Sequence, residues 1–259
     1  MSIFMLKMLA LILMLADHIG IFFEPQLSQG TYVLLRSLGR LSYPLFLFCL
    51  AEGLAHTHSR PRYLLRLYAM SLFMVALGWA ADRYLPTEAG FGTHNIFAAL
   101  ALVAYLVCLI DLCQQNPRLG GLMLIALAGL HLLFGALLAF PALQVGWLGW
   151  LPSLGVDRMA GVLPNLLFVE FGPAYVLLGV LIYYLRERRE LLCLLFLLLG
   201  VFQLEQDMAY QKTVWQCFFV LALLPVLAYN GRRGPGLKWF FYLFYPVHMG
   251  LLFYLANFV

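Results

Sequence analysis

Residues 4–23 read FMLKMLALILMLADHIGIFF, an apolar run long enough to cross a bilayer as one helix. Within it, only Lys7, Asp17 and His18 carry basic, acidic or imidazole side chains. The stretch predicts a transmembrane helix at the start of the chain. It also raises the question of why a lipid-spanning segment holds an Asp-His pair.

The rest of the chain has a similar composition. Of its 259 residues, 64% belong to the set AVILMFWYC and only 11% are charged, with a net charge of +4. A soluble domain carries about 25% charged residues, and one core could not hide this much apolar surface. An aromatic share of 15% argues against intrinsic disorder. The long continuous runs favour helices over a membrane barrel, whose strands alternate over about ten residues.

Apolar windows separated by charged and Pro/Gly-rich clusters predict an all-α membrane bundle of about nine transmembrane helices. We expect them to form a single domain over residues 1–259. The longest connection, 141–164, contains two tryptophans and is predicted to lie at the membrane interface. The nine windows are 4–23, 31–56, 62–82, 94–112, 119–140, 165–185, 190–204, 213–229 and 237–257.

Basic residues in the connections and near the ends of the windows predict the orientation. Eleven of them share the side of the amino terminus, and three lie on the other side. Because basic loops stay in the cytoplasm, we expect a cytoplasmic amino terminus and a periplasmic carboxyl terminus in the bacterial inner membrane. The inner set is Lys7, Arg60, Arg62, Arg66, Arg118, Arg186, Arg188, Arg189, Arg232, Arg233 and Lys238, and the outer set is Arg83, Arg158 and Lys212.

A group of polar residues lies deep within the predicted spans. A charge at a helix centre costs about 2.5–3.5 kcal/mol, so these side chains should face the bundle interior. Arg36 and Arg40 share a helix face, and a histidine beside a carboxylate could transfer protons. A structural ion pair between Asp17 and an arginine is the alternative. The deep layer comprises Asp17, His18, Arg36, Arg40, His94 and His248.

A second polar layer is predicted near the cytoplasmic surface. Lys7 and His18 are eleven residues apart, so they share a face about 16 Å apart along the axis. Lys238, Tyr245 and His248 form a similar stripe on the last span. Clustered cations at the inner end suit a phosphate-bearing ligand. The inner layer comprises Lys7, His56, Arg60, Arg62, Lys238 and the loop arginines. Glu52 and His56 share a face at the inner end of the second span, and Pro44 is predicted to bend that span between its two polar groups.

Four strings resemble the TraX family, whose namesake acetylates the amino terminus of F pilin. They are LADHIG at 15–20, RSLGRLSYPLF at 36–46, AEGLAHT at 51–57 and KWFFYLFYPVH at 238–248. The family is similar to integral membrane acyltransferases of the type-3 group, where ten residues separate a basic residue from a first-span histidine. Lys7 and His18 match that spacing.

The resemblance implies transfer of an acetyl or other acyl group from cytoplasmic acetyl-coenzyme A to an amine or hydroxyl in or across the membrane. The acceptor could be a pilin amino terminus, a glycan or a small amine, with membrane lipid around the bundle. No metal and no nucleic-acid partner is expected. The implied catalytic residues are His18, Asp17, Arg36 and Arg40, and the implied donor-binding residues are Lys7, Glu52, His56, Arg60, Arg62, Lys238, Tyr245 and His248.

Two other function classes compete with an enzyme. A proton- or ion-coupled transporter also needs paired charges within the membrane, although no inverted repeat is visible in this chain. A structural or assembly subunit would use the same charges to hold helices together. An acyltransferase should bind and turn over acetyl-coenzyme A, whereas a transporter or a structural subunit should do neither.

Overall fold

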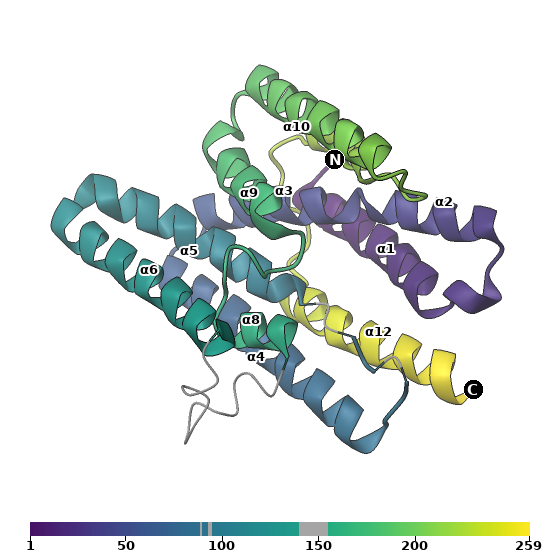
Figure 1. Cartoon of the computed structure of the whole chain (residues 1–259). Coiled ribbons are helices and arrows are strands. Elements are labelled where there is room, and N and C mark those ends of the chain that lie inside the picture. Colours follow the sequence, from purple (N-terminus) through teal and green to yellow (C-terminus); the bar gives the residue numbers. More distant parts are fainter. Residues whose placement is uncertain (89, 93–94, 140–154) are drawn as a thin grey trace. The chain divides into compact units, whose positions relative to one another are not determined.

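The structure is a computed structural model that describes residues 1–88, 90–92, 95–139 and 155–259. Over these ranges the chain is helical, with no strand (Figure 1). The elements are α1 (Ile3–Phe22), η1 (Glu24–Gln26), α2 (Gln29–Gly39), α3 (Ser42–Ala55), α4 (Arg60–Tyr84), α5 (Ile96–Gln115), α6 (Pro117–Ala139), α8 (Val156–Val162), α9 (Gly172–Leu185), α10 (Arg189–Ala209), η4 (Gln216–Ala222), α11 (Leu223–Leu227) and α12 (Lys238–Phe258).

Seven helices in the described ranges are long and apolar enough to cross a membrane, with α2 and α3 counted together as Gln29–Ala55. The other two predicted windows hold shorter apolar helices, Gly172–Leu185 and Gln216–Leu227. A straight span needs about 20 residues, so the predicted number of nine is not confirmed by helix length. The all-helical, multi-pass character of the prediction is confirmed.

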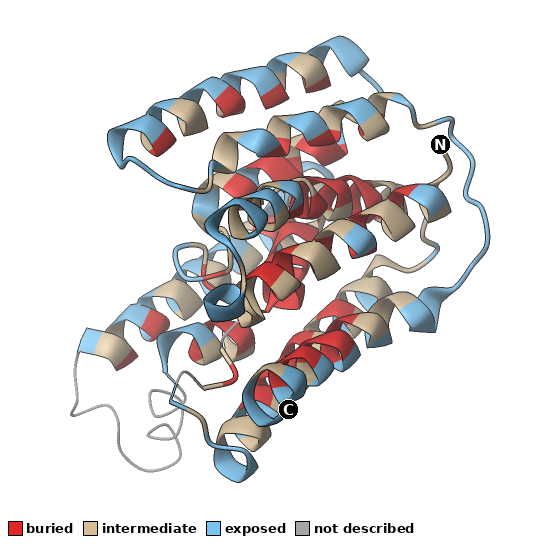
Figure 2. Cartoon of the chain, turned by 90° about the vertical axis from the view of Figure 1, so that its right-hand side faces the viewer, coloured by how far each residue is buried: buried red, intermediate tan, exposed pale blue. Residues whose placement is uncertain are grey.

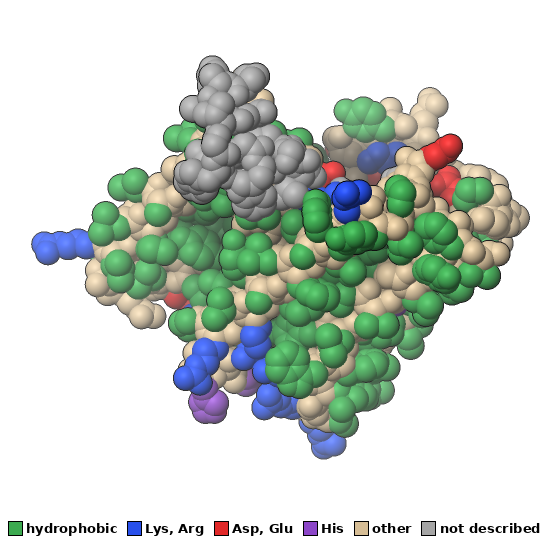
Figure 3. Space-filling view, turned by 90° about the horizontal axis from the view of Figure 1, so that it is seen from below, with side chains coloured by type: hydrophobic (Ala, Val, Ile, Leu, Met, Phe, Trp, Pro, Cys, Tyr) green, Lys and Arg blue, Asp and Glu red, His purple; other side chains and the backbone are tan. Residues whose placement is uncertain are grey.

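Large apolar side chains are exposed along the helices. On α6, Leu122, Ile125 and Leu132 are 64, 71 and 75% exposed, whereas only Gly120, Phe134 and Leu137 are buried. Figure 2 shows exposed residues along much of the helix surface, and Figure 3 shows hydrophobic side chains over the face that it presents. A soluble monomer rarely exposes apolar surface this extensive, so these helices face lipid.

The chain divides into two compact units. The first combines Met1–Gly53 with Leu181–Val259, and the second is Leu54–Val180. In the first unit α1 packs against α2 and α12, while η4 packs against α10 and α2. In the second unit α5 packs between α4 and α6, and α8 packs against α4 and α5. The first unit therefore joins residues from both ends of the sequence.

The second predicted span is broken between α2 and α3, as the position of Pro44 predicted. Proline has no N–H to donate to the carbonyl of Arg40, and its ring clashes with that carbonyl. A new helix beginning at Ser42 places Pro44 in the first turn, where no intrahelical donor is needed. Arg40 therefore lies at the break, and its Nε donates to the carbonyl of Arg36 at 3.1 Å. Its guanidinium thus satisfies a carbonyl at the end of α2.

The first residues of the chain are fastened to the loop before α12. The amides of Ile3 and Phe4 donate to the carbonyls of Arg232 and Arg233 at 2.9 and 3.2 Å, and the amide of Asn230 donates to Met1. These bonds hold the amino ends of α1 and α12 together. The two helices also pack against each other.

The connection before α9 contains α8, a short helix that the sequence did not predict. Its backbone comes close to α4 because Gly161 has no side chain, and a Cβ there would lie 2.5 Å from Val75. Ser71 donates to the carbonyl of Gly161 at 2.7 Å. The other part of the predicted interfacial segment, up to residue 154, lies outside the described residues.

Candidate functional site

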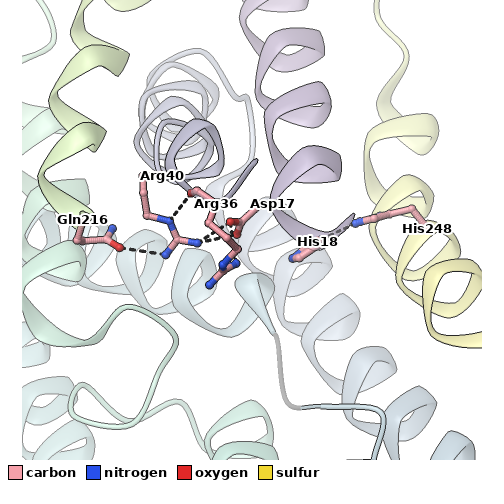
Figure 4. Close-up of polar contacts among 6 residues, drawn as sticks. All are labelled: Asp17, His18, Arg36, Arg40, Gln216 and His248. Carbon is pink, nitrogen blue, oxygen red and sulfur yellow. Dashed lines mark hydrogen bonds and ion pairs between the residues drawn. The ribbon is translucent and has the colours of Figure 1, made fainter. Parts of the chain in front are cut away.

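Asp17 on α1 receives two arginines from α2 (Figure 4). Arg36 Nη1 donates to Asp17 Oδ1 at 2.7 Å, and Arg40 Nη2 lies 2.6 and 2.8 Å from the two carboxylate oxygens. Gly39 permits this approach, since a Cβ there would lie 2.3 Å from the Asp17 side chain. The predicted shared face of the arginines is confirmed. The ion pair considered as a structural alternative is also present.

The two arginines differ in how many of their donors are used. Arg40 donates from Nη2 to Asp17, from Nε to the carbonyl of Arg36, and from Nη1 to Gln216 Oε1 at 3.0 Å. Arg36 Nε is buried without a hydrogen-bond partner in the described part of the chain. Two permanent cations and one carboxylate leave the cluster with a surplus positive charge. Arg36 is therefore the arginine with capacity to bind a further anion or oxyanion.

Gln216 belongs to the cluster but was not predicted from the sequence. It begins η4, whose position depends on Asp207 at the end of α10. The buried Asp207 carboxylate accepts from the amide of Cys217 at 2.9 Å and from Gln203 Nε2 at 3.2 Å. The available signal was a polar run, QLEQD at 203–207, directly after an apolar window. A carboxylate that is buried at this position needs hydrogen-bond donors, which indicates that backbone amides of another segment lie beside it.

His18 lies one residue after Asp17 but points toward α12 (Figure 4). Its Nδ1 is 2.7 Å from Nε2 of His248, and the rings stack with centroids 4.9 Å apart. His248 Nδ1 lies 2.7 Å from the carbonyl of Phe244. Tyr245 packs its ring edgewise against both histidines, at 5.9 and 5.5 Å. The His18 and His248 residues are 4 and 5% exposed, so the pair is almost fully buried.

Asp17 and His18 are adjacent in the sequence, but their side chains contact different helices. Successive helix residues point about 100° apart, and Asp17 turns toward α2. The deep layer thus contains a charged cluster with Asp17 and a histidine pair with His248. The two groups share α1, where Asp17 and His18 are adjacent.

Lysines occupy the amino ends of the two helices that carry the histidine pair. Lys7 Nζ lies 5.3 Å from the centre of the Phe241 ring, and Lys238 Nζ lies 4.9 Å from the Trp239 ring. On α1 the histidine follows the lysine by eleven residues, and on α12 it follows by ten. Because these helices run side by side, the structure places both predicted stripes next to each other.

Glu52, predicted to bind the donor, is held by side chains of the first unit. Tyr229 donates its hydroxyl to Glu52 Oε2 at 2.9 Å, and Arg186 Nε lies 3.9 Å from Glu52 Oε1. Tyr229 and Arg186 are both additions to the predicted set. The three residues place the loops after α9 and α11 at the same end of α3.

The remaining predicted donor-binding residues belong to the second unit. His56 and Arg62 are exposed, and Arg60 forms an ion pair with Asp111. His94 lies outside the described residues. No group of three or more His, Cys, Asp or Glu side chains suited to a metal ion occurs in the ranges that were searched.

His131 on α6 makes the contacts of a helix-packing residue. Its Nδ1 lies 2.9 Å from the carbonyl of Leu127, and its Nε2 accepts from the amide of Leu166 at 3.0 Å. Both ring nitrogens are thus used by the backbone of the second unit. This arrangement fixes α6 to the segment before α9.

Comparisons with known proteins bear on the whole chain. A profile of the family described as TraX protein matches residues 2–151. The chain is 30% identical over 267 residues to the probable fimbrial assembly protein FimC, serogroup H1, of Dichelobacter nodosus, covering 97% of this chain and 94% of that protein. No solved structure matches it. Together with the multi-pass helical fold, these matches show that the chain belongs to the TraX family.

Proposed function

We propose that this chain is an inner-membrane acyltransferase that moves an acetyl group from cytoplasmic acetyl-coenzyme A to an amine or hydroxyl in or beyond the membrane. The observation that carries the proposal is the buried His18–His248 pair on helices whose amino ends hold Lys7 and Lys238. A base deep in the membrane and cations about 16 Å away suit a thioester on a long arm with phosphates at its other end.

The chemistry requires one base and one oxyanion site. His18 removes a proton from the acceptor nitrogen or oxygen as that atom attacks the thioester carbonyl. The new bond joins the acceptor to the acyl carbon, and the carbonyl oxygen becomes an oxyanion that Arg36 stabilises. Collapse breaks the carbon–sulfur bond, and the proton on His18 passes to the departing coenzyme A thiolate. Asp17 and Arg40 hold Arg36 in place.

The acceptor is proposed to be a pilin amino terminus. The support is membership of the TraX family and the similarity to a protein named for fimbrial assembly. A glycan or a small amine would undergo the same chemistry. Mass spectrometry of pilin and other envelope material, from cells with and without the gene, identifies which molecule loses an acetyl group.

The orientation proposed from the basic loops has structural support in the first unit. Arg186 and Tyr229 both contact Glu52, at the end of α3 that we place in the cytoplasm. This arrangement supports α9 and the η4–α11 segment as short crossings, giving nine in all. Reporter fusions after Asn116 and Arg188 should read cytoplasmic, and a fusion after Val259 should read periplasmic. Periplasmic signals after both Arg188 and Val259 would reduce the number of crossings to seven.

Purified protein tests the activity directly. In detergent it should hydrolyse acetyl-coenzyme A slowly and should melt at a higher temperature when coenzyme A is added, because a ligand that binds only the folded state stabilises it. His18→Gln should keep the melting shift and lose the hydrolysis. A transporter or a structural subunit would show neither response, and that result would overturn the proposal.

A further inference from the structure

The hydrogen bonds of the histidine pair run in one direction. A carbonyl oxygen only accepts, so the short contact with Phe244 requires a proton on His248 Nδ1. In a neutral imidazole the other nitrogen then carries a lone pair, so His248 Nε2 accepts. His18 Nδ1, 2.7 Å away, must therefore donate. The basic nitrogen of His18 is consequently Nε2.

We infer that His248 is a positioning residue that fixes the tautomer of His18 and so makes Nε2 the catalytic base. This inference rests on the proposed acyl transfer. Without the contact to His248, the proton of a neutral His18 could lie on either ring nitrogen. Nδ1 is the nitrogen that points at α12. The carbonyl of Phe244 can only accept a hydrogen bond. A neutral histidine pair therefore forms both contacts only when the protons lie on Nδ1 of His248 and on Nδ1 of His18.

The same partner also accommodates the charge that forms during the reaction. When Nε2 of His18 gains a proton, the ring becomes an imidazolium whose Nδ1–H still donates to His248. A carboxylate would stabilise this cation more strongly, but Asp17 is bonded to Arg36 and Arg40 instead. Tyr245 on α12 packs against both rings, and Asp17, which precedes His18 on α1, belongs to the arginine cluster. The partner of His18 on α12 is thus an imidazole and not a carboxylate.

Packing alone does not account for the contact. Phe244 stacks on His248 at 4.9 Å, and Tyr245 packs against it edgewise, so an apolar ring would fill this position. Phenylalanine cannot accept a proton from His18, however, and would leave a buried donor without this partner. Glutamine has a carbonyl that can accept near the position of Nε2. These two substitutions therefore separate ring packing from hydrogen bonding.

The test combines kinetics with a direct reading of the tautomer. His248→Phe should lower kcat roughly 10²-fold with little change in the KM for acetyl-coenzyme A, and His248→Gln should recover most of that loss. Nitrogen NMR of histidine-labelled protein, assigned with a His18→Gln control, should find His18 protonated at Nδ1 in the wild type. In His248→Phe the proton should shift toward Nε2. Circular dichroism and thermal melting check that each variant folds.

Each outcome separates the two proposals. A His18 protonated at Nε2 in the wild type overturns the inference, as does full activity in a well-folded His248→Phe variant. Protonation at Nδ1 in a protein that never transfers an acetyl group would leave the hydrogen-bond direction standing and reject the function. The expected tautomer together with a His248-dependent kcat supports both.

Discussion

Each compact unit contains a helical histidine that donates to the carbonyl four residues earlier, yet the second contact of the ring differs. His131 in the second unit accepts from the amide of Leu166, whereas His248 in the first contacts the imidazole of His18, from which we infer that it accepts. A backbone amide does not exchange its proton during a catalytic step, so the chain of bonds ends at His131. The imidazole of His18, in contrast, can gain and lose a proton. The same local arrangement therefore serves packing in one unit and, under the proposed function, proton transfer in the other.

The ion pairs of the two units differ in a similar way. Asp17 holds two arginines and its side chain is 12% exposed, whereas Asp82 pairs with one, Arg158, and is 33% exposed. Asp82 also accepts from the amide of Phe91 at 2.6 Å, which fixes a loop. The Asp17 cluster thus carries a surplus positive charge next to His18, whereas Asp82 and Arg158 balance each other.

The largest expected difference between the units concerns catalysis. His18→Ala should reduce acetyl transfer roughly 10²–10⁴-fold, the usual contribution of a positioned acid–base group. His131→Ala should leave kcat unchanged, because it removes only contacts with the backbone. Single-turnover assays on both folded variants measure the contrast. Equal activity in the two variants would show that His18 is also a packing residue, and the base would then be sought at His94 or His248.

Stability should also separate the two carboxylates. Asp17→Ala strands two guanidinium groups and should lower the free energy of unfolding by about 3–5 kcal/mol. Asp82→Ala removes a carboxylate that is 33% exposed and strands one guanidinium instead of two, so it should cost less, about 1–2 kcal/mol. Denaturant unfolding in detergent micelles, followed by circular dichroism, gives both values. A larger loss for Asp82 than for Asp17 would contradict the assignment of the buried cluster to the first unit.

A smaller effect is expected at Gln216, which orients Arg40. Gln216→Ala removes one hydrogen bond to a charged group and should cost about 1 kcal/mol, with a modest loss of turnover. Gln115→Ala, at the exposed end of α5, is the matched control in the second unit and should be neutral. Melting temperatures measured side by side provide the comparison. A neutral Gln216 variant would exclude η4 from the site.

The smallest effect is expected for the surface cations. Lys238→Ala should raise the KM for acetyl-coenzyme A by roughly threefold to tenfold, with less change in kcat, and added salt should reduce the difference. Arg62→Ala tests whether a cation of the second unit also lowers the KM for acetyl-coenzyme A. Arg83→Ala is the control, because Arg83 is exposed and is predicted to lie on the outer side. An unchanged KM in Lys238→Ala would remove this lysine from the donor path.

Local features of the fold were predictable from the sequence. Composition indicated a membrane bundle, the four-residue spacing of Arg36 and Arg40 predicted their shared face, and Pro44 predicted the break beside Arg40. All three depend on residues close together in the chain. Chain-local rules of helix geometry are sufficient for them.

Contacts between distant segments were not predictable. His18 and His248 are 230 residues apart, and Gln216 meets Arg40 across 176 residues. No helical period connects such positions, so a single sequence leaves the partner of each histidine open. The lengths of α9 and η4–α11 were also missed, because apolar composition continues past the residues that are helical in the structure.

The distribution of the site along the chain bears on how the protein is made. Asp17, Arg36 and Arg40 leave the ribosome within 24 residues of one another, so the costly charges can neutralise each other as the first hairpin enters the membrane. His248 is synthesised only with the last helix. The backbone hydrogen bonds of residues 3 and 4 cannot form until Arg232 and Arg233 have been synthesised. Synthesis thus yields an inserted but inert intermediate first. Under the proposed function, a chain interrupted before α12 would hold its ion cluster but lack the residue that orients the base, so it would not consume acetyl-coenzyme A.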